Sequence, residues 1–335
     1  MKFLIIVFSL FSRAVCRFKN FLYDRHVIEP QKPPLPVISV GNITFGGSEK
    51  TPLAMELIHF LLNQDFKPAF ISRGYRGKWE KDGGILSDGK NILGTWTDSG
   101  DEPYMVARNF PQAGVFIGKR RILSCQKAKD LGFNIAVLDD GLQHRRLDRD
   151  LEIVLHNPRE KWALREGPSA LKRADILLLD GGEPTSGKLR RKIPSGVPLM
   201  EYRVTAKRLR RLENEEPAPL QDFRQKRVLA FCGIARPERF FSLLKKEGLE
   251  PVFHTKFPDH YPYSRRSLKK IAKKCKDLQI EAAVTTEKDA VRLLDRLDLL
   301  KDIPVYYLKI GLELEKSFTD KILLFLQAQP RKEKK

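Results

Sequence analysis

Short runs of apolar residues recur along the first two thirds of the chain, and the segments between them are polar or have helical spacing. Such runs are typical of strands buried on both faces, and their alternation with helices favours a mainly parallel sheet covered by helices. The segment after the first run predicts a helix at Pro52–Asn63, with proline at a tolerated early position. The expected strands are Pro36–Val40, Pro68–Ser72, Ala113–Ile117, Ile135–Leu138, Leu151–Leu155 and Ile176–Leu179.

The composition changes near residue 200, and a second α/β unit is expected soon afterwards. Glu201–Leu212 is highly basic and suited to an extended hairpin, whereas Glu213–Pro219 is acidic and contains prolines, so a domain boundary is expected nearby. The second unit is expected to have strands at Arg227–Cys232, Pro251–Phe257, Ala282–Thr286 and Val305–Ile310, with helices at Pro237–Glu247 and Ser264–Leu278.

The N-terminal segment is apolar but too short to cross a bilayer. Phe3–Phe11 is apolar apart from Ser9, whereas a spanning helix needs roughly 20 residues. Continued as a helix to about Tyr23, the segment gathers its polar residues along one side. This arrangement predicts a helix that lies in the membrane interface. A signal peptide and a helix packed on its own domain are the alternatives.

Composition and charge narrow the class of protein. The 335 residues are 41% hydrophobic and 31% charged, which excludes a disordered chain, a collagen and a coiled coil. The net charge of +20 favours an anionic partner, which can be a nucleic acid, a phosphorylated ligand or an acidic membrane surface. The four cysteines are far apart and form no C-x-x-C pair, so a reducing, cytosolic setting fits better than a disulfide framework or a structural zinc site.

A glycine-rich loop, Gly41–Thr51, joins the first expected strand to the first expected helix. Backbone N–H groups and a helix N-terminus at such a place bind phosphate oxygens. The pattern predicts Lys50 against the β- and γ-phosphates and Thr51 on Mg²⁺. Glu49 and Thr44 stand where the usual pattern has glycine, so an ordinary glycine-rich turn is the alternative. The loop residues assigned to the nucleotide are Asn42, Gly46, Gly47, Ser48, Glu49, Lys50 and Thr51.

Two adjacent carboxylates, Asp139 and Asp140, end the apolar strand that begins after Asn134. Phosphate-loop enzymes hold a Mg²⁺ ligand, or the waters of the ion, at this place. The alternative is a helix cap or a turn pair after a strand. With the phosphate loop upstream, the pair favours a nucleotide and metal site.

Further short motifs follow one another along most of the chain. They are Leu22–Arg25, Val37–Asn42, Ser72–Tyr75, Gly100–Pro103, Asp139–His144, Ser169–Asp175, Phe257–His260 and Thr286–Asp289. Taken in this order, the motifs resemble those of the tetraacyldisaccharide 4′-kinases of lipid A biosynthesis, and as a set they are very specific. The resemblance implies a membrane-surface kinase that moves the γ-phosphoryl group of ATP to the 4′-hydroxyl of an acylated glucosamine disaccharide 1-phosphate. It also implies two α/β/α domains, the first a P-loop NTPase-like mainly parallel sheet, joined by a β-hairpin linker.

The chemistry asks for a base, since a sugar hydroxyl is a poor nucleophile and a positioned carboxylate contributes roughly 10²- to 10⁴-fold. Asp101 is the candidate base, and the resemblance matches it with His260 as a catalytic pair contributed by the two domains. Taken alone, Asp101 suits a helix cap, and His260 suits a buried histidine with its hydrogen bonds satisfied.

The remaining work is charge neutralisation, because phosphoryl transfer depends chiefly on positioning and electrostatics. Lys50, Mg²⁺ and Arg121 are the cations expected on the triphosphate, with Arg120 as the alternative to Arg121. For Arg165 and Glu166 a solvated charge pair is the alternative to a role in the site. The metal shell is expected to comprise Thr51, Asp139 and Asp140, to which the resemblance adds Glu102 and Glu166, and the expected substrate contacts are Arg73, Gln143, His144 and Arg165.

These observations predict five regions: 1–29 as the interfacial N-terminal helix, 30–198 as the P-loop kinase domain, 199–226 as the hairpin linker, 227–328 as the second α/β domain and 329–335 as a basic tail. The resemblance implies a peripheral protein at the cytoplasmic face of the inner membrane. The expected partners are the acylated disaccharide 1-phosphate and an anionic membrane surface, with no nucleic acid.

Two departures from the family pattern favour a rival interpretation. Glu49 replaces a glycine, and Asn157–Glu166 is shorter than the family's loop. The rival is a nonenzymatic peripheral membrane protein that binds nucleotide or lipid with a decayed P-loop. A nucleic-acid binder is a third possibility, based on the basic runs Lys207–Arg211 and Lys269–Lys276. Because these runs lack interleaved aromatics, solvated faces or attraction to acidic headgroups explain them more simply.

Overall fold

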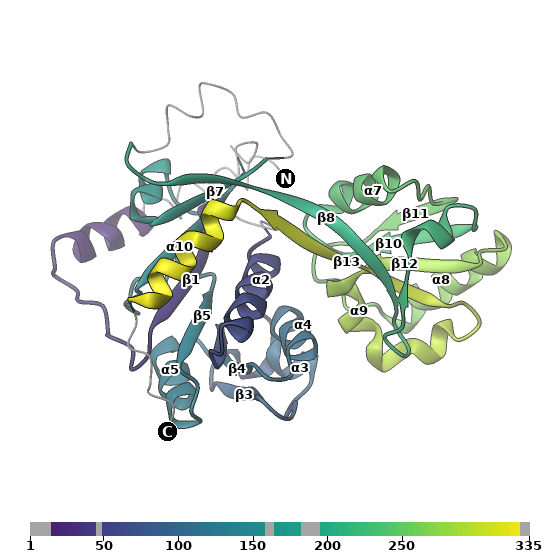
Figure 1. Cartoon of the computed structure of the whole chain (residues 1–335). Helices are drawn as coiled ribbons and strands as arrows, with labels where there is room; N and C mark the ends of the chain where they lie inside the picture. Colours follow the sequence, from purple (N-terminus) through teal and green to yellow (C-terminus); the bar gives the residue numbers. More distant parts are fainter. Residues whose placement is uncertain (1–14, 45–48, 158–163, 182–194, 329–335) are drawn as a thin grey trace. The chain divides into compact units, whose positions relative to one another are not determined.

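The computed structural model describes residues 15–44, 49–157, 164–181 and 195–328 (Figure 1). The chain divides into two compact units, Met1–Arg203 with Leu312–Lys335, and Val204–Gly311. Two long strands, β8 (Leu199–Arg211) and β13 (Val305–Leu314), are hydrogen-bonded neighbours and carry the chain between the units. A short antiparallel partner, β9 (Pro217–Ala218), pairs with the end of β8.

The first unit contains the expected mainly parallel sheet, in the order β8-β7-β6-β1-β5-β2-β4-β3. Six of its strands are buried along their whole length, which explains their uninterrupted apolar sequences. The edge strand β3 pairs antiparallel with β4 and was not expected, because its sequence GILSD has only two neighbouring apolar side chains and no apolar run. The strands are β1 (Val37–Asn42), β2 (Pro68–Ser72), β3 (Gly84–Asp88), β4 (Gly114–Ile117), β5 (Ile135–Asp139), β6 (Leu151–His156) and β7 (Ile176–Asp180).

Helices connect these strands. The helix after β1 begins at Lys50, two residues before the expected start, so Lys50 and Thr51 lie in its first turn. A capping box formed by Thr95 and Asp98 starts the short helix that precedes Asp101. The helices are α2 (Lys50–Asn63), α3 (Trp96–Ser99), α4 (Asp101–Asn109), α5 (Arg121–Asp130) and the 3₁₀ segments Lys78–Glu80 and Pro168–Arg173, together with a helix over residues 15–24.

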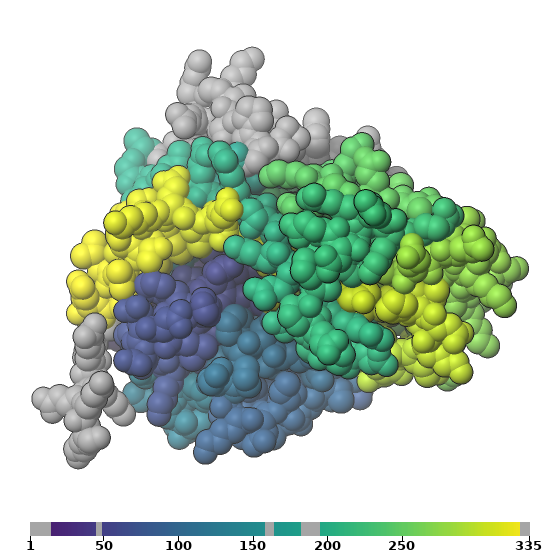
Figure 2. All heavy atoms as spheres, turned by 45° about the vertical axis from the view of Figure 1, so that its right-hand side comes forward, coloured from purple at the N-terminus to yellow at the C-terminus, as the bar shows by residue number. Residues whose placement is uncertain are grey.

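The C-terminal helix α10 (Lys316–Gln327) belongs to the first unit and lies at its surface (Figure 2). The Leu312 N–H, in the strand that leads to α10, donates to Glu56 on α2 at 3.3 Å, and the Glu201 N–H donates to Glu315 at 2.8 Å. The range expected for the second domain, 227–328, includes α10, whereas contacts group this helix with the first unit. The sequence pattern shows that the helix is amphipathic but does not say which core its apolar side covers.

The second unit is a parallel sheet in the order β11-β10-β12-β13 with helices on its faces and an apolar core on each side. Its elements agree with the expected ones with three exceptions. β11 is shorter, because this edge strand is half exposed, and β13 continues past the expected end at Ile310 to Leu314. Helix α9 was not expected. The elements are β10 (Val228–Cys232), β11 (Phe253–Lys256), β12 (Ala282–Thr286), α7 (Pro237–Lys246), α8 (Arg265–Asp277), α9 (Glu287–Leu293) and the 3₁₀ segments Leu220–Phe223 and Leu294–Leu300. No helix within the described parts of either unit combines the length and the apolar character that a membrane span requires.

Candidate active site

The loop between β1 and α2 ends in a strained residue. Glu49 has φ 54° and ψ 24°, in the left-handed region where glycine is the usual occupant. This explains why related phosphate loops have glycine there. The hydroxyl of Tyr202 donates to the Glu49 carboxylate at 3.5 Å, so this side chain has a partner on β8. Gly46, Gly47 and Ser48 lie outside the described residues.

The first turn of α2 has the properties of an anion site. It contains Lys50 and Thr51 and no acidic residue, so the positive end of the helix dipole is not neutralised from within the helix. The Lys50 ammonium lies 3.3 Å from Asp140 Oδ1, and Arg165 Nη1 lies 2.5 Å from Asp140 Oδ2. Burial opposes ionisation of Asp140, but Lys50 and Arg165 outweigh it and hold the pKa of this carboxyl well below its usual range. Asp140 is therefore a carboxylate between two cations.

Asp139, the last residue of β5, is in the opposite situation. Its side chain is buried, accepts one hydrogen bond from the Ser72 hydroxyl at 3.3 Å, and has no partner for Oδ1 among the described residues. Burial and the nearby negative charges of Glu102 and Asp140 raise the pKa of Asp139 to about 7. A buried carboxylate oxygen without a donor, beside further carboxylates, suits a hard divalent cation. The residues present therefore fit Mg²⁺.

Helix α4 presents the candidate base. The backbone turns sharply at Gly100, where φ is 90°, and Asp101 is the first residue of the helix. The Asp101 side chain is buried and accepts a hydrogen bond from the Glu102 N–H at 2.9 Å. The N-cap of α4 is Gly100, so Asp101 is not the helix cap that the alternative interpretation predicted, and its role as the base stays a prediction. Helix α4 contacts β2 and β4 of the sheet, and the negative charge of Glu102 acts on Asp139 at the end of β5.

Arg121 meets the requirements for an internal cation better than Arg120. Arg121 is only 4% exposed, and its Nη1 donates to the carbonyls of Gly118 and Lys119 at 3.4 Å, whereas Arg120 is exposed. Burial lowers the pKa of Arg121, and the charges of Asp140 and Asp139 oppose this effect. Within the described residues Arg121 Nε has no hydrogen-bond acceptor. The buried guanidinium can thus still accommodate an anionic oxygen.

Three of the expected substrate residues have structural partners, one of them being Arg165 through its ion pair with Asp140. Gln143 Nε2 donates to the Asn42 carbonyl at 2.8 Å and supports the start of the phosphate loop. Burial, followed by the charges of Arg121 and Lys19, lowers the pKa of His144 to about 3, so its imidazole is neutral. Arg73 is about half exposed and pairs with Glu80 at 2.6 Å.

The N-terminal helix packs against this site with its polar side, a contact that the sequence pattern did not reveal. Lys19 Nζ donates to the Gln143 carbonyl, and Asn20 Nδ2 donates to Glu166 Oε2, both at 2.6 Å. Glu166 is buried and also pairs with Arg173 at 2.7 Å, while its Oε1 has no hydrogen-bond partner among the described residues. Glu166 thus fastens the helix and keeps one oxygen for a ligand. The only sign of these contacts in the sequence was the motif Ser169–Asp175, which contains Arg173.

The other side of this helix is apolar and exposed. Val15, Phe18 and Phe21 are 51%, 65% and 52% exposed, at a spacing that puts them on one side. The helix over residues 15–24 therefore packs on its own unit, as one of the alternatives predicted, whereas insertion of its apolar side into a membrane interface stays a prediction. The apolar run Phe3–Phe11 lies outside the described residues.

His260 lies in the second unit, in the loop after β11. Its backbone is left-handed, with φ 57°, and its N–H donates to the Gly233 carbonyl at 3.1 Å. Lys288 Nζ lies 3.2 Å from Nε2, and Asp259 Oδ2 lies 3.8 Å from the same nitrogen. The pairing of His260 with Asp101 stays a prediction.

A buried ion pair holds the His260 loop, and its roles were not expected. Asp289 is fully buried and pairs with Arg292 at 2.8 Å. Arg292 donates to the carbonyl of Tyr261 in this loop at 2.9 Å and to that of Gly233, directly after β10, at 3.1 Å. Asp289 is the last residue of the Thr286–Asp289 motif, so the sequence indicated that this residue matters. It did not indicate which distant residues Asp289 and Arg292 contact.

Comparison with known proteins gives the family. A family model described as tetraacyldisaccharide-1-P 4′-kinase matches residues 1–327. The tetraacyldisaccharide 4′-kinase of Syntrophus aciditrophicus is 36% identical over 96% of this chain and 92% of the relative, and that of Pelodictyon phaeoclathratiforme is 34% identical over 90% of each.

A solved structure extends the likeness to three dimensions. The crystal structure of the "apo" form of LpxK from Aquifex aeolicus in complex with ATP covers 97% of this chain and 98% of its own, with a TM-score of 0.78 and 30% identity. The α/β fold class and the resemblance expected from the motifs are both confirmed. On the match across almost its whole length, this chain belongs to the tetraacyldisaccharide-1-P 4′-kinase family.

Proposed function

We propose that this protein is a kinase that transfers the γ-phosphoryl group of ATP to the 4′-hydroxyl of an acylated glucosamine disaccharide 1-phosphate. The observation that carries the proposal is the charge arrangement at the ends of β1 and β5. There a carboxylate holds Lys50 and Arg165 together beside a second, buried carboxylate with an unpaired oxygen. The family membership supplies the reaction and the substrate class.

The nucleotide binds at the N-terminus of α2. The N–H groups of the first turn and the Lys50 ammonium bind the β- and γ-phosphate oxygens, and Arg121 and Arg165 neutralise further charge. Thr51, Asp139 and Asp140 would hold Mg²⁺, with Glu102 and Glu166 directly or through water. A bound Mg²⁺ would neutralise charge on the phosphates, and its positive charge would favour the ionised form of Asp139. Asn42 and the loop residues Gly46, Gly47, Ser48 and Glu49 complete the proposed nucleotide contacts.

Asp101 acts as the base. Its carboxylate accepts the proton of the 4′-hydroxyl while the hydroxyl oxygen bonds to the γ-phosphorus, and the bond from that phosphorus to its bridging oxygen breaks to release ADP. His260 orients Asp101 or tunes its pKa, and Lys288 and Asp259 in turn surround the imidazole. A histidine held by this many groups has a fixed ring position, which the role requires.

The acylated substrate is taken from a membrane surface. The exposed apolar side of residues 15–24 inserts at the interface, and the net charge of +20 favours acidic lipid. Arg73, Gln143, His144 and Arg165 contact the disaccharide and its phosphate. We place the protein at the cytoplasmic face of the inner membrane, where ATP is present.

The test is transfer of label from γ-labelled ATP to the acylated disaccharide 1-phosphate in detergent micelles with Mg²⁺. The wild-type chain labels the lipid at the 4′ position. Asp101→Asn loses at least about a hundredfold in turnover and keeps its ATP affinity, because it removes the base and leaves the phosphate site. Asp130→Asn on exposed α5 is the matched control. Nucleotide binding without transfer by the wild-type chain would instead support the nonenzymatic, decayed-site interpretation.

A further inference from the structure

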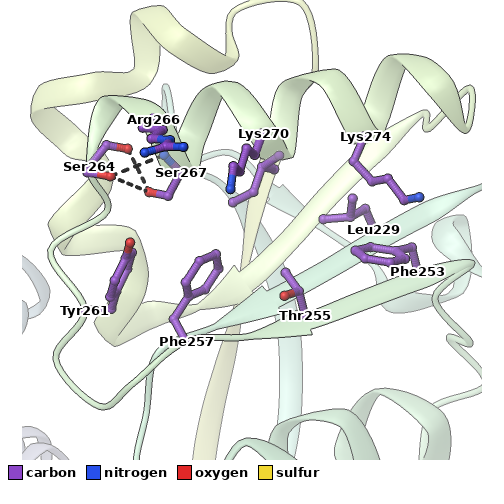
Figure 3. A pocket seen from close by; sticks show the side chains of 11 residues that line it. Leu229, Phe253, Thr255, Phe257, Tyr261, Ser264, Arg266, Ser267, Lys270 and Lys274 are labelled. Atoms are coloured by element: carbon purple, nitrogen blue, oxygen red, sulfur yellow. Dashed lines mark hydrogen bonds between the residues drawn. The ribbon is translucent and has the colours of Figure 1, made fainter.

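The second unit contains a groove of ≈ 700 Å³ between helix α8 and the edge strand β11 (Figure 3). None of its lining residues is among those proposed for phosphoryl transfer. Its size is that of a pocket for a small ligand. The groove is lined by Leu229, Phe253, Thr255, Phe257, Tyr261, Ser264, Arg266, Ser267, Lys270, Ile271 and Lys274.

One wall of the groove is a row of cations. Arg266, Lys270 and Lys274 follow one another at four-residue spacing on α8, so they lie along one side of the helix. None of the three forms an ion pair with another described residue, and the lining contains no acidic side chain, whereas the neighbouring Arg265 pairs with Asp298 at 3.6 Å. Three positive charges with no counter-charge favour an anionic ligand.

The opposite side of the groove is apolar. Phe253, Thr255 and Phe257 alternate along β11 and its end, so their side chains share one face of the strand, and Tyr261 follows in the loop. β11 pairs with β10 alone and is the last strand of the sheet, so the groove runs along an edge. The lining therefore combines anion-binding groups with aromatic and aliphatic surface, the combination that an amphiphile requires.

The ring geometry distinguishes between two kinds of anionic ligand. Aromatic side chains that bind single-stranded nucleic acid present a face on which a base stacks. Here Phe257 and Tyr261 stack on one another at 4.7 Å with an interplanar angle of 22°, and Lys274 Nζ lies 4.9 Å over the Phe253 ring. One face of each of these three rings is therefore already in contact, which leaves less ring surface for base stacking, whereas acyl carbons pack against ring edges as well as faces.

We propose that this groove binds an anionic phospholipid of the bilayer, with the headgroup phosphate at Arg266, Lys270 and Lys274 and the first acyl carbons against Phe253 and Phe257. The second unit then has its own membrane contact, separate from the N-terminal helix. Lipid binding by this groove goes beyond the proposed kinase function and does not depend on phosphoryl transfer.

The experiment compares two full-length triple variants of the same helix. Arg266→Gln/Lys270→Gln/Lys274→Gln removes the groove cations, and Lys269→Gln/Lys273→Gln/Lys276→Gln removes the same charge from exposed positions outside the groove. Binding is measured by co-sedimentation with phosphatidylcholine vesicles that contain phosphatidylglycerol. We expect the groove variant to lose at least about tenfold in affinity and the control variant less than about threefold, since a charge acts strongly only close to the lipid phosphate. Thermal unfolding verifies that both variants fold.

A third variant tests the apolar side. Phe253→Ser is expected to weaken vesicle binding about threefold or more, because the position is partly exposed and contacts the acyl carbons. Equal losses in the two triple variants, or an unchanged affinity in Phe253→Ser, would reduce the effect to diffuse charge and overturn the proposal. Loss of binding to single-stranded oligonucleotide with unchanged vesicle binding would overturn it in favour of a nucleic acid. We expect the groove variant to keep its kinase activity in detergent micelles. Failure of the lipid-binding proposal can therefore be distinguished from failure of the proposed kinase function.

Discussion

Two buried aspartates, one in each unit, show how the same residue is used in opposite ways. Asp289 accepts hydrogen bonds from the Gly233 N–H, the Tyr263 hydroxyl and the Thr286 hydroxyl in addition to its pair with Arg292. Asp139 accepts one long hydrogen bond and has an oxygen with no donor among the described residues. Folding satisfies the first carboxylate completely, which marks it as structural, and leaves the second for a ligand.

The largest effect is expected when Asp139 loses its charge. Asp139→Asn should reduce phosphoryl transfer on the order of 10³-fold, because the unpaired oxygen that fits Mg²⁺ no longer carries charge. Unfolding in urea without Mg²⁺ should show unchanged or increased stability. Asp289→Asn serves as the matched variant in the other unit. It should lose far less turnover per folded molecule than Asp139→Asn, because Asp289 acts on the reaction only through the position of the His260 loop. Comparable turnover in the two variants would contradict the distinction between them.

The next largest effect concerns stability, and here Asp289 rather than Asp139 is the residue whose loss matters. Asp289→Asn should lower the free energy of unfolding by about 3 kcal/mol, because it leaves the buried Arg292 guanidinium without its counter-charge. Urea unfolding followed by circular dichroism gives this value. Asp298→Asn is the control, since its pair with Arg265 is exposed and should contribute less than about 1 kcal/mol. If the two variants were equally stable, the hydrogen bonds of Asp289 would not be what holds the His260 loop.

A smaller effect follows from the titration of Asp139. Because burial raises its pKa from 3.8 to about 7, its contribution to stability is fully present below about pH 4 and is lost as the pH rises through about 7. The free energy of unfolding of the wild type should therefore fall relative to Asp139→Asn by on the order of 1 to 3 kcal/mol over this interval. Saturating Mg²⁺ should abolish the fall in the wild type alone. A constant difference between the two proteins from pH 4 to 8 would show that Asp139 does not titrate there.

The sequence predicts the parallel strands well and the contacts of the site only in part. Strands such as β1 and β5 are buried on both faces, so their apolar runs are unambiguous. β3 was not predicted because this partly buried antiparallel edge strand lacks such a run. The assignment of α10 differs for another reason, since the amphipathic pattern of a helix does not name the core that it covers.

Within the site, local sequence patterns predicted which residues take part, whereas their partners became known only from long-range contacts in the structure. Lys50 and Asp139 follow from a strand, a loop and a helix in sequence. The contact of Glu166 with Asn20, 146 residues away, and that of Glu49 with Tyr202, 153 residues away, depend on the tertiary fold. A single sequence contains no physical signal for such pairs, because each partner is compatible with many others until the fold is known.

The smallest effect separates backbone strain from charge at Glu49. Glu49→Gly removes the carboxylate and relieves the left-handed conformation, whereas Glu49→Ala removes only the carboxylate. We expect the glycine variant to be more stable than the alanine variant by roughly 1 kcal/mol in thermal unfolding. If the carboxylate repels phosphate, both variants should bind ATP severalfold more tightly than the wild type in titration calorimetry. Tighter binding by the glycine variant alone would assign the effect to the backbone, and unchanged binding in both would show that the partner at Tyr202 already keeps the charge away from the nucleotide.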